Sequence, residues 1–178
     1  MRKIEVVLHN PEWRSEFERE SKLVIAALGD IGNNLITIHH IGSTSIPGIY
    51  AKPIIDMLAE VSNIELVDER NRHMEALGYE AMGEFGIPGR RYFRKEINFI
   101  RTHHVHTFQT QSPDIARHLY FRDYMIAHPK YAQQYSELKQ KLARQFPEDI
   151  EGYMDGKDEF IKDMQSRAKE WKNKSIQS

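Results

Sequence analysis

The stretch from residue 36 to residue 61 limits the possible folds of this chain more than any other part of the sequence. A β-rich segment, 36–41, runs directly into the turn-forming sequence Gly42-Ser43-Thr44-Ser45-Ile46-Pro47-Gly48. Such a concentration of glycine, serine and proline interrupts regular structure. A second apolar segment, 54–61, follows Lys52-Pro53 and has the length of a buried strand. We therefore predict two strands joined by a loop that begins with a tight turn.

The rest of the chain supplies further strands and most of the helices. We expect strands at residues 4–8, 91–95 and 101–109, and helices at 11–29, 66–77, 112–128, 131–146 and from about residue 152. Strands concentrate before residue 110 and helices after it, a distribution typical of the α+β class. The prediction is one domain over residues 1–172, with a small mixed β-sheet covered by helices (sheet-rich 1–110, helical 111–172), and a frayed tail over 173–178.

Composition excludes several classes of protein. The chain has 178 residues, 40% of them hydrophobic and none of them cysteine, which favours one globular domain and rules out disulfides, zinc fingers and thiol catalysis. A net charge of −1 does not predict general nucleic-acid binding. The first eight residues are too polar for a signal peptide, and no apolar run approaches the roughly 18 residues of a membrane helix. We expect a cytoplasmic protein with no membrane association.

The most specific feature is the run from His40 to Gly48 followed by Lys52-Pro53-Ile54-Ile55-Asp56, which resembles the GrpB family (UPF0157 type). The resemblance covers nearly the whole chain and continues through Gly86-Ile87-Pro88-Gly89-Arg90-Arg91, Arg101-Thr102-His103-His104-Val105-His106, Phe121-Arg122-Asp123-Tyr124, His128-Pro129 and Gly156-Lys157. It implies a nucleotidyltransferase-like fold of the polymerase-β type. Related domains are fused to the coenzyme-A biosynthetic kinase in some bacteria, so it also implies an accessory role.

The nucleotidyltransferase pattern is a strand, a Gly-Ser turn into a short helix, and a strand that carries carboxylates. Glycine lets backbone amides approach a phosphate, and serine adds a hydroxyl donor. The carboxylates hold divalent cations. In this chain Gly42 and Ser43 match the turn as phosphate-binding residues, and Asp56 matches the first carboxylate, which makes Ser43 and Asp56 the candidate catalytic pair. Leu58, two residues further along the same strand face, stands where the second carboxylate is expected, and a leucine cannot bind a metal.

Two histidines are candidates to replace the missing carboxylate. His104 and His106 lie two apart on a predicted strand, so their rings project to one face, while His103 faces the other way. If that strand neighbours the strand of Asp56, the three side chains form a ligand set for zinc, manganese or iron, and a less natural one for magnesium. The alternative is that the histidines bind substrate phosphate or satisfy buried polar groups.

Three basic residues are candidates for phosphate binding. Arg91 and Arg94 belong to a cluster of basic residues around the strand at 91–95, and arginine offers paired donors to phosphate oxygens. The alternative for this cluster is a charged edge strand. Lys157 stands among the apolar positions of the last helix, where it either extends to solvent or points into the pocket and meets a phosphate.

Two functions are compatible with these residues. One is a metal-dependent nucleotidyltransferase that uses Mg, Mn or Zn and transfers a nucleotidyl group to a small acceptor. The other is a non-catalytic module, or a coenzyme-A kinase-associated accessory domain, that binds a nucleotide or another phosphorylated small molecule. A weaker third hypothesis is phosphoester hydrolysis at a metal held by the histidines. The sequence does not indicate a protein partner.

Overall fold

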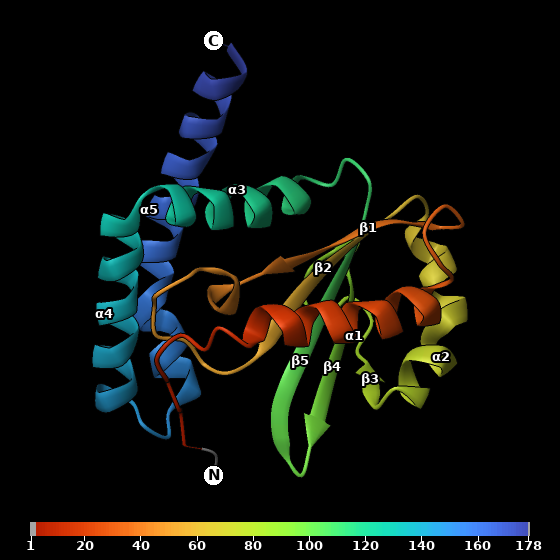
Figure 1. Cartoon of the computed structure of the whole chain (residues 1–178), viewed down its shortest axis with the longest axis horizontal. Helices are drawn as coiled ribbons and strands as arrows, with labels where there is room; N and C mark the ends of the chain where they lie inside the picture. Colours follow the sequence, from red (N-terminus) through yellow and green to blue (C-terminus); the bar gives the residue numbers. More distant parts are fainter. Residues whose placement is uncertain (1–2, 178) are drawn as a thin grey trace.

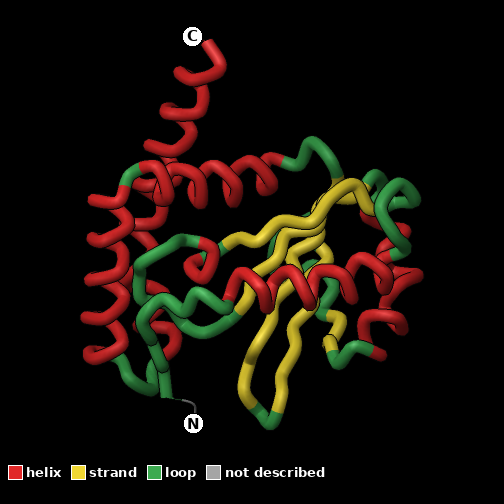
Figure 2. The backbone as a smooth tube through the Cα atoms, in the orientation of Figure 1, coloured by secondary structure: helices red, strands yellow, loops and turns green. Residues whose placement is uncertain are grey.

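Five strands form one mixed sheet in the order β1-β2-β5-β4-β3 in the computed structural model, which describes residues 3–177. The strands are β1 (Leu35–Ile41), β2 (Ile55–Val61), β3 (Tyr79–Ala81), β4 (Arg91–Ile97) and β5 (Ile100–Gln109). β2 and β5 are parallel, whereas the other three pairs are antiparallel. The parallel pair lies at the centre of the sheet (Figure 2), so side chains from distant parts of the sequence meet there.

The helices are α1 (Trp13–Leu28), α2 (Asn71–Ala76), α3 (Pro113–Ala127), α4 (Pro129–Gln145) and α5 (Ile150–Gln177), with 3-10 turns η1 (Ser43–Ser45) and η2 (Ile64–Arg70). α1 crosses the sheet, and α4 and α5 lie side by side beyond its edge (Figure 1). Local signals set the helix ends. The Ser112 hydroxyl accepts from the Asp114 N–H before Pro113 opens α3, and Gly29 ends α1 with φ +105°.

The two faces of the sheet carry different side chains because successive strand residues alternate. On one face Met57 and Ala59 of β2 are fully buried in a core shared with Trp13 and Val24 of α1. On the other face β2 presents Asp56 and Leu58. Leu58 is fully buried and packs in a second cluster with Ile41, Phe108 and Ile115 of α3. The position expected for a second carboxylate is therefore part of the hydrophobic core.

The helical half packs against the loop between β1 and β2. Ile46 and Ile49 of this loop are buried with Tyr124 of α3, Tyr135 of α4 and Met164 of α5. This contact fixes the loop between the sheet and the helices. Among residues 3–177, no helix combines the length and the apolar character that a bilayer crossing requires.

The α+β prediction, with a small mixed sheet and a helical C-terminal part, is confirmed. Three local predictions are wrong. Residues 4–8 form only an isolated bridge, Val7 with Ala51, because this partner lies in the loop before β2 and not in a strand of the sheet. The helix expected at 66–77 is divided into η2 and α2. The expected frayed tail is helical as far as Gln177. The strand β3 was not expected from the sequence.

Replacing Leu58 by alanine should lower the free energy of unfolding by about 2–5 kcal/mol, because it leaves a cavity in a site that neighbouring side chains fill. Chemical denaturation measures this change. The matched control is Leu23→Ala on α1, where the leucine is 49% exposed and the change should stay within about 0.5 kcal/mol. Equal losses for the two variants would contradict the core role of Leu58.

Candidate functional site

Three side chains from the two central strands converge on one face of the sheet. Asp56 of β2 is the register partner of His104 of β5, and His106 lies two residues further along β5 on the same face. Asp56 Oδ1 is 3.0 Å from His104 Nδ1 and 3.4 Å from His106 Nε2. One ligand atom from each residue lies within 4.8 Å of the other two. The structure thus brings together the aspartate and the two imidazoles that the sequence selected.

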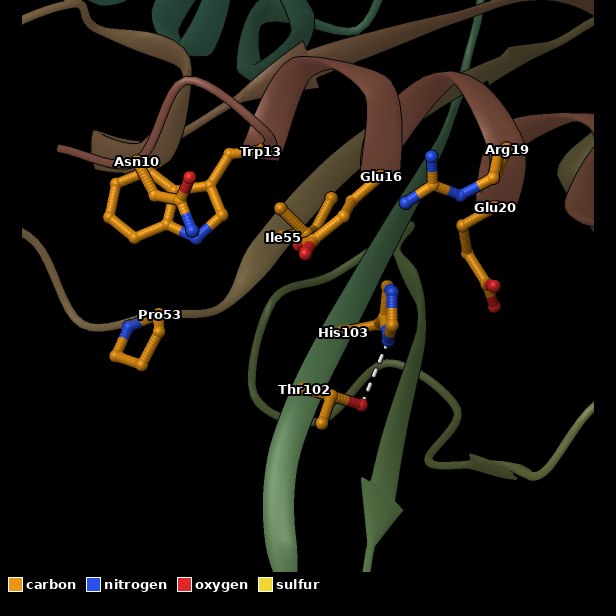
Figure 3. Close-up of a pocket in the computed structure, with 9 residues that line it drawn as sticks. All are labelled: Asn10, Trp13, Glu16, Arg19, Glu20, Pro53, Ile55, Thr102 and His103. Atoms are coloured by element: carbon orange, nitrogen blue, oxygen red, sulfur yellow. Dashed lines mark hydrogen bonds between the residues drawn. The ribbon is translucent and has the colours of Figure 1, made fainter.

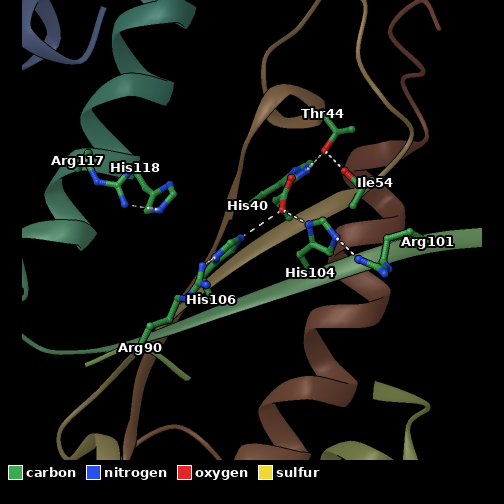
Figure 4. A network of polar contacts seen from close by, with 10 residues as sticks. His40, Thr44, Ile54, Arg90, Arg101, His104, His106, Arg117 and His118 are labelled. Carbon is green, nitrogen blue, oxygen red and sulfur yellow. Dashed lines mark hydrogen bonds and ion pairs between the residues drawn. The ribbon is translucent and has the colours of Figure 1, made fainter. Parts of the chain in front are cut away.

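Two arginines contact the outer ring nitrogens of His104 and His106, the nitrogens that face away from Asp56 (Figure 4). Arg90 Nη1 is 3.2 Å from His106 Nδ1, and Arg101 Nη1 is 3.4 Å from His104 Nε2. Arginine only donates hydrogen bonds, so each outer ring nitrogen accepts and the ring proton lies on the inner nitrogen. Asp56 then accepts two N–H groups. Burial alone would raise the pKa of Asp56, but the hydrogen bonds and electrostatic influence of His104 and His106 hold it well below the usual 3.8.

The Gly42-Ser43 turn lies against the Asp56 carboxylate. Gly42 has φ +75°, and a Cβ at this position would lie 2.7 Å from Asp56 Oδ2. Only glycine allows both this backbone conformation and this approach. Ser43 opens η1, and its side chain lies close enough to the hydroxyl of Tyr135, which belongs to α4, to lower the pKa of that hydroxyl against the larger effect of burial, which raises it. The turn therefore links the carboxylate to the helical half.

Hydrogen bonds of Thr44 fix the turn to β1 and to the residue that precedes β2. The residue is 3% exposed, and its hydroxyl donates to the Ile54 carbonyl at 3.0 Å and contacts His40 Nε2 at 2.9 Å (Figure 4). The His40 ring stacks on Phe17 at 4.8 Å between centroids, and its carbonyl accepts from Arg122 of α3. Burial lowers the pKa of His40 to about 4, so the ring is neutral at neutral pH. A neutral Nε2–H is the donor that Thr44 requires.

The predicted phosphate-binding residues divide into two groups. Lys157 lies in the interior: it is 7% exposed and its Nζ sits 4.6 Å from the centre of the Tyr153 ring. Arg94 shares the face of its strand partner His104, but its guanidinium contacts Glu80. Arg91 lies on the opposite face, where it pairs with Asp68 at 2.7 Å. The structure therefore does not bring Arg91 to the site, because a carboxylate on η2 already holds it.

Sequence reasoning missed two lysines near Lys157. Lys139 of α4 is 2% exposed, and Lys52 lies in the loop before β2. Besides burial, the charge of Lys52 lowers the pKa of Lys157. Burial and the charge of Lys157 in turn lower the pKa of Lys139. The signal for Lys139 was present, because it stands four residues after Tyr135 in the apolar stripe of its helix, as Lys157 stands four after Tyr153.

A separate cavity opens on the other face of the sheet (Figure 3). It measures about 490 Å³ and is lined by His103 and Thr102 of β5 and by α1 residues such as Glu16 and Arg19. His103 Nδ1 contacts the Thr102 hydroxyl at 2.8 Å. His103 thus points away from Asp56, as strand alternation predicts, and provides a control for the two histidines of the site.

The donor set of the site suits a divalent cation of the zinc or manganese class. One carboxylate and two imidazoles at this spacing are typical of such ions and less so of magnesium. The hydrogen-bond partners of the outer histidine nitrogens are unusual for a metal site, however. A metal-bound histidine ordinarily donates its second N–H to an acceptor, whereas here arginines donate to the outer nitrogens. Cation binding therefore requires the inner protons to leave and at least one arginine to move.

Comparison with known proteins identifies relatives along nearly the whole chain. The family model described as GrpB protein matches residues 3–167. The UPF0157 protein YqkA of Bacillus subtilis is 50% identical over 171 residues, which is 96% of this chain and 49% of that protein, so the chain spans about half the length of this relative. The crystal structure of GrpB from Enterococcus faecalis superposes with a TM-score of 0.88 and 44% identity over 94% of this chain and 99% of that one. A dephospho-CoA kinase of Mycolicibacterium paratuberculosis is 24% identical over 94% of this chain and 46% of its own length.

The buried neutral His40 should make stability depend on pH. Its pKa is about 6.5 in the unfolded chain and about 4 in the folded protein, so the unfolded state binds more protons between these values. The contribution of His40 to the free energy of unfolding should therefore be complete above pH 6.5. It should fall as the pH drops toward 4, by at most about 1.4 kcal/mol per pH unit.

Urea denaturation at several pH values tests this expectation in the wild type and in His40→Gln, which keeps an amide donor near Thr44. The variant should show a shallower slope between pH 4 and pH 6.5. Parallel slopes would mean that His40 does not titrate in the way its burial indicates.

Proposed function

This chain belongs to the GrpB family, and we propose that it binds a nucleotide at the Asp56 site and transfers the nucleotidyl group to a small acceptor. One observation carries the proposal: Asp56, His104 and His106 converge next to a turn that only glycine permits. A carboxylate, imidazoles and turn amides side by side are the groups that phosphoryl chemistry uses.

The residues take the following roles in this proposal. Ser43 and the turn amides bind phosphate oxygens, and Lys157 neutralises charge on the outer phosphates. Asp56, His104 and His106 hold a divalent cation, which would supply charge stabilisation to the phosphates. The acceptor oxygen or nitrogen forms a bond to the α-phosphorus, the bond from that phosphorus to the bridging oxygen breaks, and pyrophosphate leaves. Asp56 and His106 are the two candidates to take the proton of the acceptor.

A second candidate function is a non-catalytic module that binds a nucleotide or another phosphorylated small molecule. The burial of Leu58 favours it, because the second carboxylate of the usual catalytic pair has no place in this core. The arginine donors behind both imidazoles favour it as well, since they stabilise the hydrogen-bonded rather than the metal-bound form. Likeness to part of a dephospho-CoA kinase is compatible with such an accessory role.

Metal binding should depend on the two histidines of the site and not on the third. Titration of manganese or zinc by calorimetry should show one site in the wild type and in His103→Ala, whose ring lies in the opposite cavity. The double variant His104→Ala/His106→Ala should lose affinity by at least about a hundredfold, because two of three ligands are gone. Unchanged affinity in the double variant would dispose of the metal centre.

Turnover separates the two candidate functions. The protein is incubated with each of the four ribonucleoside triphosphates, a mixture of small hydroxyl and amine acceptors, and magnesium, manganese or zinc. Nucleotidyl transfer releases pyrophosphate, and Asp56→Asn should slow it by about 10²–10⁴-fold, the range for loss of a positioned base. Release of orthophosphate would indicate hydrolysis instead. Thermal stabilisation by a nucleotide with neither product would favour the binding module.

A further inference from the structure

Three lysines gather between the helical half and the end of the sheet. Lys139 comes from α4, Lys157 from α5 and Lys52 from the loop before β2. Lys139 and Lys157 are 2% and 7% exposed, whereas Lys52 is partly exposed, so the cluster reaches solvent through Lys52. Burying one ammonium group is costly unless it is paired, and burying several next to each other costs more.

Aromatic rings take the place of counter-ions in this cluster. The ammonium groups of Lys52 and Lys157 lie 5.2 Å and 4.6 Å from the centre of the Tyr153 ring, and that of Lys139 lies 4.4 Å from the centre of the Tyr135 ring. The negative face of a ring attracts a cation but does not neutralise it. Asp56 acts on Lys52 and Lys157 from a distance, yet its carboxylate already accepts from two imidazoles.

Two buried polar atoms of this cluster lack a hydrogen-bond partner. Among the residues that the structure describes, four buried side-chain nitrogen or oxygen atoms are unpaired, and Lys139 Nζ and Tyr153 Oη are two of them. An unpaired buried donor calls for a specific explanation, because native structures contain few of them. Here an amine and a hydroxyl of one cluster, both able to donate, are unpaired. A ligand rich in acceptors would satisfy both.

We propose that Lys52, Lys139 and Lys157, with the hydroxyl of Tyr153, form a binding site for the linked phosphates of a di- or triphosphate, with inorganic pyrophosphate as its minimal ligand. The inference deepens the proposed function, on which it rests for the nucleotide part of the ligand. Three cations match the charge of two linked phosphates better than that of a single phosphate. The ammonium group of Lys139 lies over the ring of Tyr135, and the hydroxyl of Tyr135 lies near the Ser43 side chain, so the lysine cluster lies next to the turn.

Close helix packing builds the cluster. A Cβ on Gly156 would clash with the Leu142 side chain, so α5 approaches α4 more closely than a larger residue would allow. The next residue, Lys157, is thereby held beside α4 at the level of Lys139. This explains why a glycine precedes the lysine in the middle of a long helix, where it costs about 1 kcal/mol relative to alanine.

Burial and the neighbouring lysines also determine the protonation state of Lys139. Burial and the charges of Lys157 and Lys52 lower the pKa of Lys139 to about 6, so in the ligand-free site its amine is neutral at pH 7.5. The groups that face it are these two lysines and the ring of Tyr135. A bound polyphosphate would favour the charged form, so binding at pH 7.5 should take up protons.

The test is binding of pyrophosphate to the full chain in EDTA, measured by calorimetry and thermal shift. The wild type should bind, whereas Lys139→Met and Lys157→Met should each bind at least about tenfold more weakly, as expected for one lost charge-assisted hydrogen bond. Neither variant should be less stable than the wild type without ligand, because each removes a buried amine that lacks a counter-ion. The control is Lys141→Met on the exposed side of α4, which should match the wild type.

Several outcomes would overturn the proposal. It fails if the wild type does not bind pyrophosphate, if both methionine variants bind it as tightly as the wild type, or if sulfate binds equally well. Because EDTA removes divalent cations, pyrophosphate binding in this test does not depend on the metal centre. A wild type that fails to bind manganese or zinc could therefore still bind pyrophosphate. Conversely, intact metal binding without pyrophosphate binding would reject the lysine site alone.

Discussion

The contact between the Asp56 carboxylate and the Gly42 turn is the constraint around which the site is arranged. It places a half-buried negative charge where two strands and a loop meet, and the fold compensates it with N–H donors from β5. The loop is held in turn by Thr44 and by the buried Ile46 and Ile49. A larger residue at position 42 would push the turn away from the carboxylate. The sheet, the loop and the helices are therefore joined at one point.

The charges around this point are unbalanced. Asp56 contributes one negative charge, whereas Arg90 and three lysines contribute positive charge or the capacity for it, and Arg101 is paired with Glu96. Leu58 removes the second negative charge that a two-cation centre would need. A site with one carboxylate and many donors is suited to an anionic ligand more than to a pair of cations. Ligand binding would then supply the missing negative charge.

Simple periodicity predicted much of the site. The side chains of Asp56, His104 and His106 were placed on one face by strand alternation, and His103 on the other. Their meeting depends on the parallel pairing of β2 with β5, in which Asp56 and His104 are partners although they lie 48 positions apart in the sequence, and no local pattern specifies this pairing. Arg91 and Arg94 point to opposite faces of β4, so at most one of them could reach the site, and no local pattern shows which face of that strand the site uses. Lys139 was missed because the tyrosines of its stripe were interpreted only as core. β3 is three residues long, too short for alternation to reveal.

The two imidazoles beside Asp56 are not equivalent, and their arginine partners explain why. Arg90 is 6% exposed and is anchored by the Glu84 and Phe85 carbonyls, so its donor to His106 is fixed in place. While Arg90 stays in place, His106 donates from Nε2 to Asp56 or to a phosphate oxygen, and it can bind a cation or accept a proton only after this inner proton has left. Arg101 is more exposed and pairs with Glu96, so it has room to leave His104. His104 is therefore the imidazole better placed to turn its inner nitrogen toward a cation.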